Sequence, residues 1–315
     1  MKIVILDGYT LNPGDLSWQG IEALGEVVYY DRTPTTLIAE RCQGATVVLT
    51  NKAPLSAEVI SQLPDLKLIS VLATGYNIVD ITAAKNHQVT VCNVPGYGTD
   101  SVAQHTWALI LELCNRVGLH ANSVQAGEWV RSPDWCYVKS PIMELAHKTL
   151  GIVGFGSIGR QVAAVGKAFG MKIIFHNRSV IACDWAEAVS LETVFATSDI
   201  VSLHCPVTPD NQQFVNATLL KQMKPTAFLI NTARGQLIHE QDLADVLSTQ
   251  VIAGAGLDVL SVEPPPAHHP LLAAPNCVLT PHNAWISKEA RQRIMQMTVD
   301  NIQAFVNQQP IHVVS

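Results

Sequence analysis

The sequence is poor in the features that mark specialised classes of protein. Charged residues make up 15% of its 315 residues and aromatic residues 6%, and lysine and arginine form no basic run. With a net charge of −6, the chain lacks the basic surface that nucleic acids and anionic membranes select, so we expect neither as a partner. An apolar fraction of 48% over this length indicates a globular protein of about two domains.

Cysteine pairs and long apolar runs are also missing. The seven cysteines include no Cys-x-x-Cys, which is typical of reduced thiols in a cytoplasmic protein, and no metal site is predicted. The longest apolar helical segment, 102–114, contains Gln104, His105 and Glu112 and is too short and polar to span a bilayer. The opening MKIVILDGY predicts a strand ending at Asp7, not a signal peptide.

What the sequence does contain is a regular alternation of short apolar runs and helical patterns. In the first third, strands are predicted at KIVIL, EVVYY, ATVVLT, KLISVLA and QVTVC, with helices near 16–24, 37–42, 57–63 and 79–86. A second series has strands at LGIVG, KIIFH, IVSLH, TAFLIN, VIAGAGLDV and CVLT. Nearly all-apolar strands separated by helices indicate parallel sheets covered on both faces. The fold class is therefore α/β, with two doubly wound, Rossmann-like domains.

Two long helices separate the two series. After a break at Pro95 to Gly98, one helix is predicted over 101–125, capped by Thr99 or Asp100, and the last helix over 287–307. The intervening segment 127–147 is irregular and aromatic. If both helices cross between domains, the first domain is discontinuous. We predict a flavodoxin-like substrate domain over 1–99 and 287–315 and a dinucleotide-binding domain over 100–286.

A glycine-rich loop supports the dinucleotide assignment. The stretch GFGSIG follows an apolar strand and opens an apolar-periodic helix; its residues are Gly154, Phe155, Gly156, Ser157, Ile158 and Gly159. The first glycine allows the turn, the second lets the backbone approach a pyrophosphate, and the third lets the helix pack against the strand. The helix N-terminus supplies free N–H groups. A turn that binds nothing and a methyltransferase-type loop remain alternatives.

The acidic residue that usually follows this pattern is absent. The next strand ends in His176 and Asn177, and Asn177 stands where an Asp or Glu normally binds the ribose 2′-hydroxyl and repels a 2′-phosphate. Asn177 keeps the hydrogen bond without the charge, and Arg178 and Ser179 can bind a 2′-phosphate. The cofactor is predicted to be NAD or NADP, with NADP accepted. The alternative is that Arg178 stacks near adenine or points to solvent while NAD binds.

Three later strands end in chemically capable side chains. Arg234 follows TAFLIN, Asp258 follows VIAGAGL with Glu263 five residues on, and His282 follows CVLT. Taken singly, Arg234 is compatible with a surface residue, Asp258 with a helix or turn cap, and His282 with an ordinary loop histidine. Because carboxyl ends of parallel strands share one edge, their convergence beside the glycine loop favours a site for hydride transfer to a 2-keto acid.

Each side chain has a role in that chemistry. His282 can donate the proton, and Glu263 can orient the imidazole and favour its protonated form. Arg234 can bind the keto oxygen and carboxylate as a planar fork, which lysine does less well. Asp258 is better suited to the nicotinamide carboxamide than to catalysis.

These residues resemble those of the D-isomer-specific 2-hydroxyacid dehydrogenases, most of all the glycerate dehydrogenase (hydroxypyruvate reductase) group. The matching stretches are LATGYNIVD, NVPGYGTDSVAQHT, KTLGIVGFGSIGR, INTARGQLI, AGAGLDV, VEPPPAHHPLL and TPHNAW. The resemblance implies that Arg234, Glu263 and His282 are catalytic. It also implies substrate binding by Thr74 and Gly75. Further cofactor contacts are implied at Cys205, Pro206, Thr232, Ala233, Arg234, Asp258 and His282.

The resemblance also implies a split first domain and a homodimer formed through the long helix and the aromatic segment after it. Trp129 and Trp135 are then either interface or core residues. The sequence departs from the family pattern at Gln104, where a glutamate is common, and at Trp285, where many members have a small residue. Trp285 can wall the substrate pocket and favour a small substrate.

The predicted substrate is a small unphosphorylated 2-keto acid such as hydroxypyruvate or glyoxylate, because no regulatory domain follows and no basic cluster lies near LATGYN. D-lactate or another 2-hydroxy acid is an alternative. Two other possibilities are a non-enzymatic protein that senses dinucleotide and a formate- or phosphite-oxidising enzyme.

Overall fold

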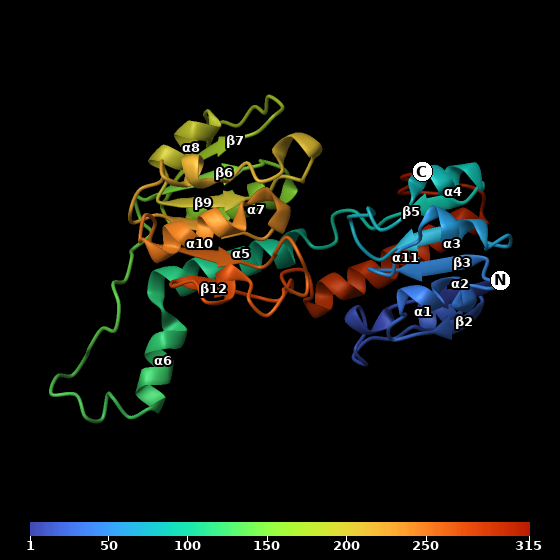
Figure 1. Ribbon diagram of the computed structural model, residues 1–315, viewed down its shortest axis with the longest axis horizontal. Coiled ribbons are helices and arrows are strands. Elements are labelled where there is room, and N and C mark those ends of the chain that lie inside the picture. The colour runs from blue at the N-terminus through green and yellow to red at the C-terminus, as the bar shows by residue number, and fades with distance from the viewer. The chain divides into compact units, whose positions relative to one another are not determined.

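The computed structural model describes residues 1–315 and divides them into two compact units (Figure 1). One comprises Met1–Gly98 and Ile286–Ser315, and the other Thr99–Trp285. The junctions lie one residue before those expected, and the first unit contains both ends of the chain. None of the helices is long and apolar enough to cross a membrane.

The first unit is a five-stranded parallel sheet in the order β2-β1-β3-β4-β5, the order of flavodoxin-like sheets. Its strands are β1 Lys2–Ile5, β2 Glu26–Tyr29, β3 Val47–Thr50, β4 Leu68–Val71 and β5 Thr90–Cys92. Its helices are α1 Gln19–Glu22, α2 Ile38–Arg41, α3 Ala57–Ser61, α4 Ile81–Asn86 and α11 Lys288–Val306, with 3-10 turns η1 Gly8–Thr10 and η2 Thr35–Leu37. Ser56, Asp80 and Ser287 cap α3, α4 and α11 through their side chains.

The second unit is a seven-stranded parallel sheet in the order β12-β11-β10-β9-β6-β7-β8. Its strands are β6 Thr149–Val153, β7 Lys172–His176, β8 Glu187–Ala188, β9 Ile200–Leu203, β10 Phe228–Asn231, β11 Gly254–Leu257 and β12 Cys277–Leu279. Its helices are α5 Thr99–Asn115, α6 Val117–Gln125, α7 Ser157–Ala168, α8 Leu191–Thr197, α9 Ala217–Leu220 and α10 Glu240–Ser248. Three 3-10 turns complete it: η3 Pro209–Asn211, η4 Gly235–Leu237 and η5 Pro270–Leu272.

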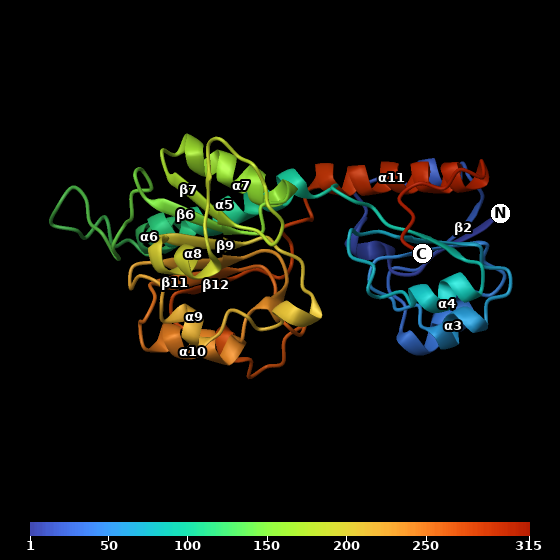
Figure 2. The same ribbon diagram turned by 90° about the horizontal axis from the view of Figure 1, so that it is seen from above.

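Both faces of each sheet are covered, as the apolar strands predict. In the second unit, α5 and α7 pack on one face around Phe155 and Phe175, while α8, α9 and α10 bury the other (Figure 2). In the first unit, α1 and α11 lie on one face and α3 and α4 on the opposite face (Figure 2). These layers leave the ends of the strands as the places where loops can form a site.

The strand register of the second unit aligns its site. Val153, Leu203, Asn231, Leu257 and Leu279 pair in sequence across five neighbouring strands. The residues that follow them therefore lie along one edge. They are Gly154, His204, Thr232, Asp258 and Thr280.

The predicted helix over 101–125 is wrong as a single helix. Arg116 adopts a left-handed conformation (φ 52°), its N–H donates to the Glu112 carbonyl, and the chain turns from α5 into α6. Thr99 and Asp100 lie inside the first turn of α5 rather than capping it. The helices α1 to α4 have four to six residues, and each is at least two residues shorter than its predicted range. The two-residue β8 was not predicted.

Candidate active site

The glycine loop has the geometry that its sequence predicts. A Cβ on Gly154 (φ +95°) would lie 2.6 Å from the Cys205 nitrogen, and one on Gly159 would lie 2.2 Å from the Gly154 carbonyl oxygen. Both positions are therefore closed to larger residues by neighbouring backbone. A Cβ on Gly156, the N-cap of α7, would meet nothing within 4 Å. Open space at the helix N-terminus suits a pyrophosphate, so the loop fits a dinucleotide.

Asn177 is tied to this loop. Its Oδ1 accepts a hydrogen bond from the Phe155 N–H (3.1 Å), and its Nδ2 donates to the Ser179 carbonyl (3.0 Å). The side chain thus joins the glycine loop to the turn after β7. Arg178 and Ser179 are exposed on that turn. Both residues considered for a 2′-phosphate are therefore open to solvent.

His282 and Glu263 form a short pair. His282 Nδ1 lies 2.6 Å from Glu263 Oε2, with both side chains about one-third exposed. The other Glu263 oxygen accepts from the Leu260 N–H at 2.9 Å. With Nδ1 committed to Glu263, Nε2 is the ring nitrogen free to serve as a proton donor. The sequence placed these residues on one edge, and the structure brings them into direct contact.

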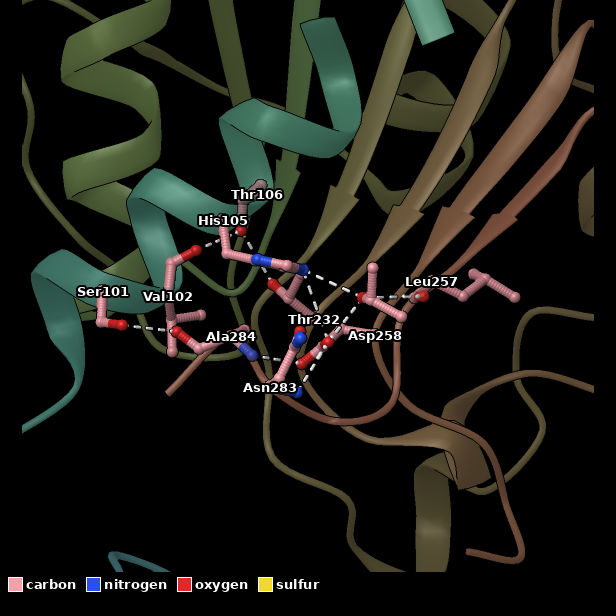
Figure 3. Close-up of polar contacts among 10 residues, drawn as sticks. Ser101, Val102, His105, Thr106, Thr232, Leu257, Asp258, Asn283 and Ala284 are labelled. Atoms are coloured by element: carbon pink, nitrogen blue, oxygen red, sulfur yellow. Dashed lines mark hydrogen bonds and ion pairs between the residues drawn. The ribbon is translucent and has the colours of Figure 1, made fainter. Parts of the chain in front are cut away.

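The loop that carries His282 is held by Asp258 (Figure 3). The Asp258 carboxylate, 1% exposed, accepts from the Thr280 hydroxyl (2.6 Å) and from the N–H groups of Asn283 (3.0 Å) and Ala284 (2.9 Å). The His282 N–H donates to the Asp258 carbonyl at 2.8 Å. His282 itself has a left-handed backbone (φ 51°), a conformation that costs of order 1–3 kcal/mol and needs such support.

Helix α5 supplies a second layer of contacts to this edge (Figure 3). His105 Nε2 lies 2.9 Å from Thr280 Oγ1 and 3.4 Å from Asp258 Oδ1. The Thr106 and Thr232 hydroxyls are 2.9 Å apart, and the Ser101 hydroxyl donates to the Ala284 carbonyl at 2.6 Å. Three residues on one face of α5 thus reach the loops after β10 and β12.

Arg234 is presented by a turn that Asn231 closes. Asn231 is fully buried; its Oδ1 accepts from the Ala233 N–H (3.0 Å) and its Nδ2 donates to the Arg234 carbonyl (2.9 Å). Arg234 is exposed, and its Nη1 donates to the Ala233 carbonyl at 2.7 Å. Four of the five guanidinium N–H groups are not used in that bond, so the fork is open to an anion.

The segment after β9 packs against the glycine loop. Pro206 is exposed and Cys205 half-buried, and burial raises the pKa of the Cys205 thiol to about 11. Burial lowers the pKa of His204 to about 3, so its imidazole is neutral and lies 2.8 Å from the Ser202 hydroxyl. Neither side chain adds charge to the cofactor edge.

The other predicted substrate residues can be placed within their own units. In the first unit, Thr74 donates its hydroxyl to the Val94 carbonyl (2.9 Å), and the Thr74 carbonyl accepts from Asn93 Nδ2 (2.8 Å). The loop of Thr74 and Gly75 is thereby fixed beside β5. In the second unit, Trp285 is partly exposed at the end of the His282 loop. No three His, Cys, Asp or Glu side chains are grouped to hold a metal ion.

Comparison with known proteins identifies the family. The NAD binding domain of the D-isomer specific 2-hydroxyacid dehydrogenases matches residues 107–284. A hydroxypyruvate reductase of Blautia hydrogenotrophica is 44% identical over the full length of both chains. A glycerate dehydrogenase of Methylorubrum extorquens is 42% identical over 99% of this chain and 98% of its own. The chain belongs to the D-isomer specific 2-hydroxyacid dehydrogenase family.

Solved structures agree with this assignment. An acyclic imino acid reductase in complex with NADPH and D-Arg superposes over the whole of both chains with a TM-score of 0.85 and 32% identity. Family membership makes the chain an oxidoreductase that acts on CH–OH groups and uses a nicotinamide dinucleotide. The predicted family, fold class and reaction class are confirmed.

Several residues around the site were missed by the sequence reasoning. These are His105, Thr106, Asn231, Glu240 and Thr280, all of which bond to loops carrying predicted residues. Asn231 and Thr280 border their strand ends and could have been found there. The others lie on helices, where nothing in the sequence indicates which loop a side chain reaches.

Proposed function

We propose that the protein is an NADPH-accepting reductase of small 2-keto acids, with hydroxypyruvate and glyoxylate as the first candidates. The observation that carries the proposal is the 2.6 Å pair of His282 and Glu263 on the sheet edge that also bears the glycine loop. An imidazole held by a carboxylate is suited to proton donation, and the adjacent loop is suited to a dinucleotide.

Each chemical requirement has a residue in this chain. When bound, the nicotinamide supplies the hydride that reduces the keto carbon. His282 Nε2 donates a proton to the developing alkoxide, while Glu263 fixes the ring through Nδ1. Arg234 binds the keto acid as a fork, and the backbone N–H groups of Thr74 and Gly75 bind the carboxylate.

Small unphosphorylated substrates are favoured by two observations. Two proteins that are similar over 99–100% of this chain are named hydroxypyruvate reductase and glycerate dehydrogenase. The loop of Thr74 and Gly75 has no cluster of lysine or arginine in its sequence, LATGYN, to hold a phosphate. Trp285 is proposed to narrow the pocket further.

NADP acceptance is proposed from the turn after β7. Asn177 brings no negative charge there, and its amide is engaged by Phe155 and Ser179. Arg178 and Ser179 are therefore the residues proposed to bind the 2′-phosphate. The proposal is supported by a structural neighbour, an acyclic imino acid reductase, whose solved complex contains NADPH.

A homodimer is proposed through α6 and the segment after it. That part of the second unit extends away from its sheet in Figure 1 and exposes Trp129 (52%), Val130 (90%) and Trp135 (86%). Exposure on this scale rules out the plain core role considered for the two tryptophans. Sedimentation velocity should give a dimer, and Val130→Glu should give a monomer. A wild-type monomer at micromolar concentration would contradict this assembly.

The central experiment is a matrix of purified protein with hydroxypyruvate, glyoxylate and pyruvate, each with NADPH and NADH. We expect the highest kcat/KM with hydroxypyruvate or glyoxylate. A preference for pyruvate would point to D-lactate. Binding of dinucleotide without turnover would favour a sensor, and oxidation of formate or phosphite in place of keto-acid reduction would favour the third alternative.

Variants test the assigned roles. His282→Ala should lower kcat by roughly 10²–10⁴-fold, the usual contribution of general acid catalysis. Arg234→Lys should raise KM for the keto acid because a point charge replaces a planar fork. An unchanged kcat in the first variant, or an unchanged KM in the second, would remove that residue from its role.

The cofactor assignment has its own matched set. Loss of one charge-assisted bond of about 1.5–3 kcal/mol predicts that Arg178→Ala lowers kcat/KM for NADPH by roughly 10- to 100-fold and leaves NADH unchanged. Asn177→Asp should shift preference to NADH, since it keeps the acceptor for Phe155 and adds a charge. Lys172→Ala, a basic residue at the opposite end of β7, is the control. Equal use of NADPH by Arg178→Ala and the control would reject the phosphate site.

A further inference from the structure

Glu240, Ser261 and His269 form a polar cluster next to the turn that bears Glu263. Glu263 and His282 are the proposed catalytic pair. Glu240, the first residue of α10, accepts the Ser261 N–H at 2.7 Å through Oε1 and the Ser261 hydroxyl through Oε2. His269 Nε2 lies 3.0 Å from the same Oε2. The side chains of Glu240 and His269 are 14% and 6% exposed. Both carboxylate oxygens are thus directed at the segment that follows β11.

An acidic residue in the first turn of a helix, such as Glu240, usually stabilises the helix by complementing its dipole. That role needs only an exposed carboxylate near the N-terminus of α10. Instead, the helix is capped by His239, and Glu240 turns to a loop 21 residues further along the chain. The His269 Nδ1 accepts from the Leu271 N–H at 3.4 Å, which places the proton on Nε2 and makes it a donor to Glu240.

The segment that Glu240 contacts, Leu260 and Ser261, begins the turn that bears Glu263. Ser261 receives Glu240 on its N–H and hydroxyl, and its carbonyl accepts from Gln236 Nε2 at 3.0 Å. A Cβ on Gly235 would lie 1.9 Å from the Leu260 carbonyl carbon, so the two backbones are in direct contact. Leu260 then donates its N–H to Glu263 Oε1, the oxygen that does not contact His282.

A continuous set of contacts therefore leads from Glu240 to the proton donor. It runs through Ser261 to Leu260, from the Leu260 N–H to Glu263, and from Glu263 to His282 Nδ1 at 2.6 Å. Because the 260–263 turn has no regular secondary structure of its own, its position depends on these anchors. A shift of about 1 Å in a catalytic group can cost about 10²-fold in rate.

We infer that Glu240, with Ser261 and His269, is a positioning residue for the catalytic pair, holding the Glu263 turn so that His282 is oriented for proton donation. The inference rests on the proposed function, since it concerns the step assigned to His282. Glu240 acts through Ser261 and Leu260 and touches neither substrate nor cofactor.

The test compares Glu240→Ala, Glu240→Gln and Ser261→Ala with wild type in hydroxypyruvate reduction with NADPH. Glu240→Ala should lower kcat roughly 10- to 100-fold, with the Kd for NADPH within about threefold of wild type. The solvent deuterium isotope effect on kcat should rise because proton transfer becomes slower. Glu240→Gln keeps an acceptor for the Ser261 N–H and should recover part of kcat. Asp245→Asn, an exposed carboxylate of α10, is the control.

Ser261→Ala removes only the hydroxyl contact and keeps the inference testable if Glu240→Ala does not fold; its kcat should fall less, with the same rise in isotope effect. A Glu240→Ala enzyme with wild-type kcat and isotope effect would overturn the inference. So would parallel losses of kcat and NADPH binding, which indicate general disruption of the sheet edge. Wild-type protein without keto-acid turnover would instead overturn the proposed function, and this inference with it.

Discussion

Asp258→Asn changes one atom of a buried carboxylate and should loosen the loop that carries His282. Asp258 accepts from Thr280 and Asn283 on Oδ1 and from Ala284 on Oδ2. An asparagine amide must face one of the two backbone N–H groups in either orientation. One charge-assisted hydrogen bond of about 1.5–3 kcal/mol is lost, and a buried donor left unpaired costs about 1–3 kcal/mol more. Removing the buried charge returns part of this, so we expect a net loss of about 2–4 kcal/mol.

Thermal unfolding measures the loss. A transition of a domain this large moves by about 2–4 °C per kcal/mol, so Asp258→Asn should lower the Tm of the second unit by about 5–15 °C. The exposed Asp245→Asn should leave it within about 2 °C, because surface substitutions change stability little. The value of kcat should also fall, because His282 belongs to the loop that Asp258 holds, and its N–H donates to the Asp258 carbonyl.

A Tm of Asp258→Asn equal to that of the control would refute the reasoning. It would mean that the loop of residues 280–284 is held without the Asp258 carboxylate. The NADPH Kd of the same variant bears on the predicted cofactor contact of Asp258: a weaker Kd supports a direct contact, and an unchanged one limits Asp258 to holding the loop.

Three further predictions follow from local geometry. Burial lowers the pKa of His204 to about 3 from an ordinary 6.5. As the pH falls between these two values, the unfolded chain takes up the proton and the folded chain does not, so the free energy of unfolding decreases. Urea unfolding should show about 2 kcal/mol less stability at pH 5 than at pH 7, with a smaller loss in His204→Gln. Gly159→Ala puts a Cβ 2.2 Å from the Gly154 carbonyl oxygen and should weaken NADPH binding, measured by fluorescence titration, and cost about 1–3 kcal/mol. Arg116→Gly removes the backbone strain of a left-handed residue between α5 and α6. It should raise the free energy of unfolding by about 0.5–1 kcal/mol, seen as a slightly higher Tm.

The parts of the fold that could be predicted are those that depend on local pattern. Every predicted strand is present, because short, nearly all-apolar runs between polar turns have few alternatives to a strand of a parallel sheet. The convergence of Arg234, Asp258 and His282 followed from the same fact, since parallel strands place their carboxyl ends on one edge. The break at Arg116 was missed because apolar residues continue at helical spacing on both sides of it, and a single left-handed residue leaves no trace in that spacing.

Contacts between distant segments were beyond the sequence. Asn177 was considered only for its missing charge, while the structure shows it bonded to Phe155, 22 residues earlier. His105 and Thr280 are 175 residues apart and meet only because α5 packs on the sheet. The role of Asp258 illustrates the limit best. Its place at a strand end suggested a ligand contact, and three donors from a loop 22 to 26 residues later occupy its carboxylate.

The proposed catalytic pair, His282 and Glu263, is supported from two sides by carboxylates that lie outside it. Asp258 fixes the backbone of the histidine half, and Glu240 fixes the turn that bears the glutamate half. A carboxylate suits this task because its two oxygens accept several N–H groups at once, which lets one side chain hold an irregular loop that has no strand or helix bonds of its own. Since the two anchors share no bond partner, their effects should be independent until the loops meet at the His282–Glu263 contact. The losses in Tm from Asp258→Asn and Glu240→Gln should therefore add in the double variant. Their losses in kcat should not add, because either substitution already misaligns the His282–Glu263 pair.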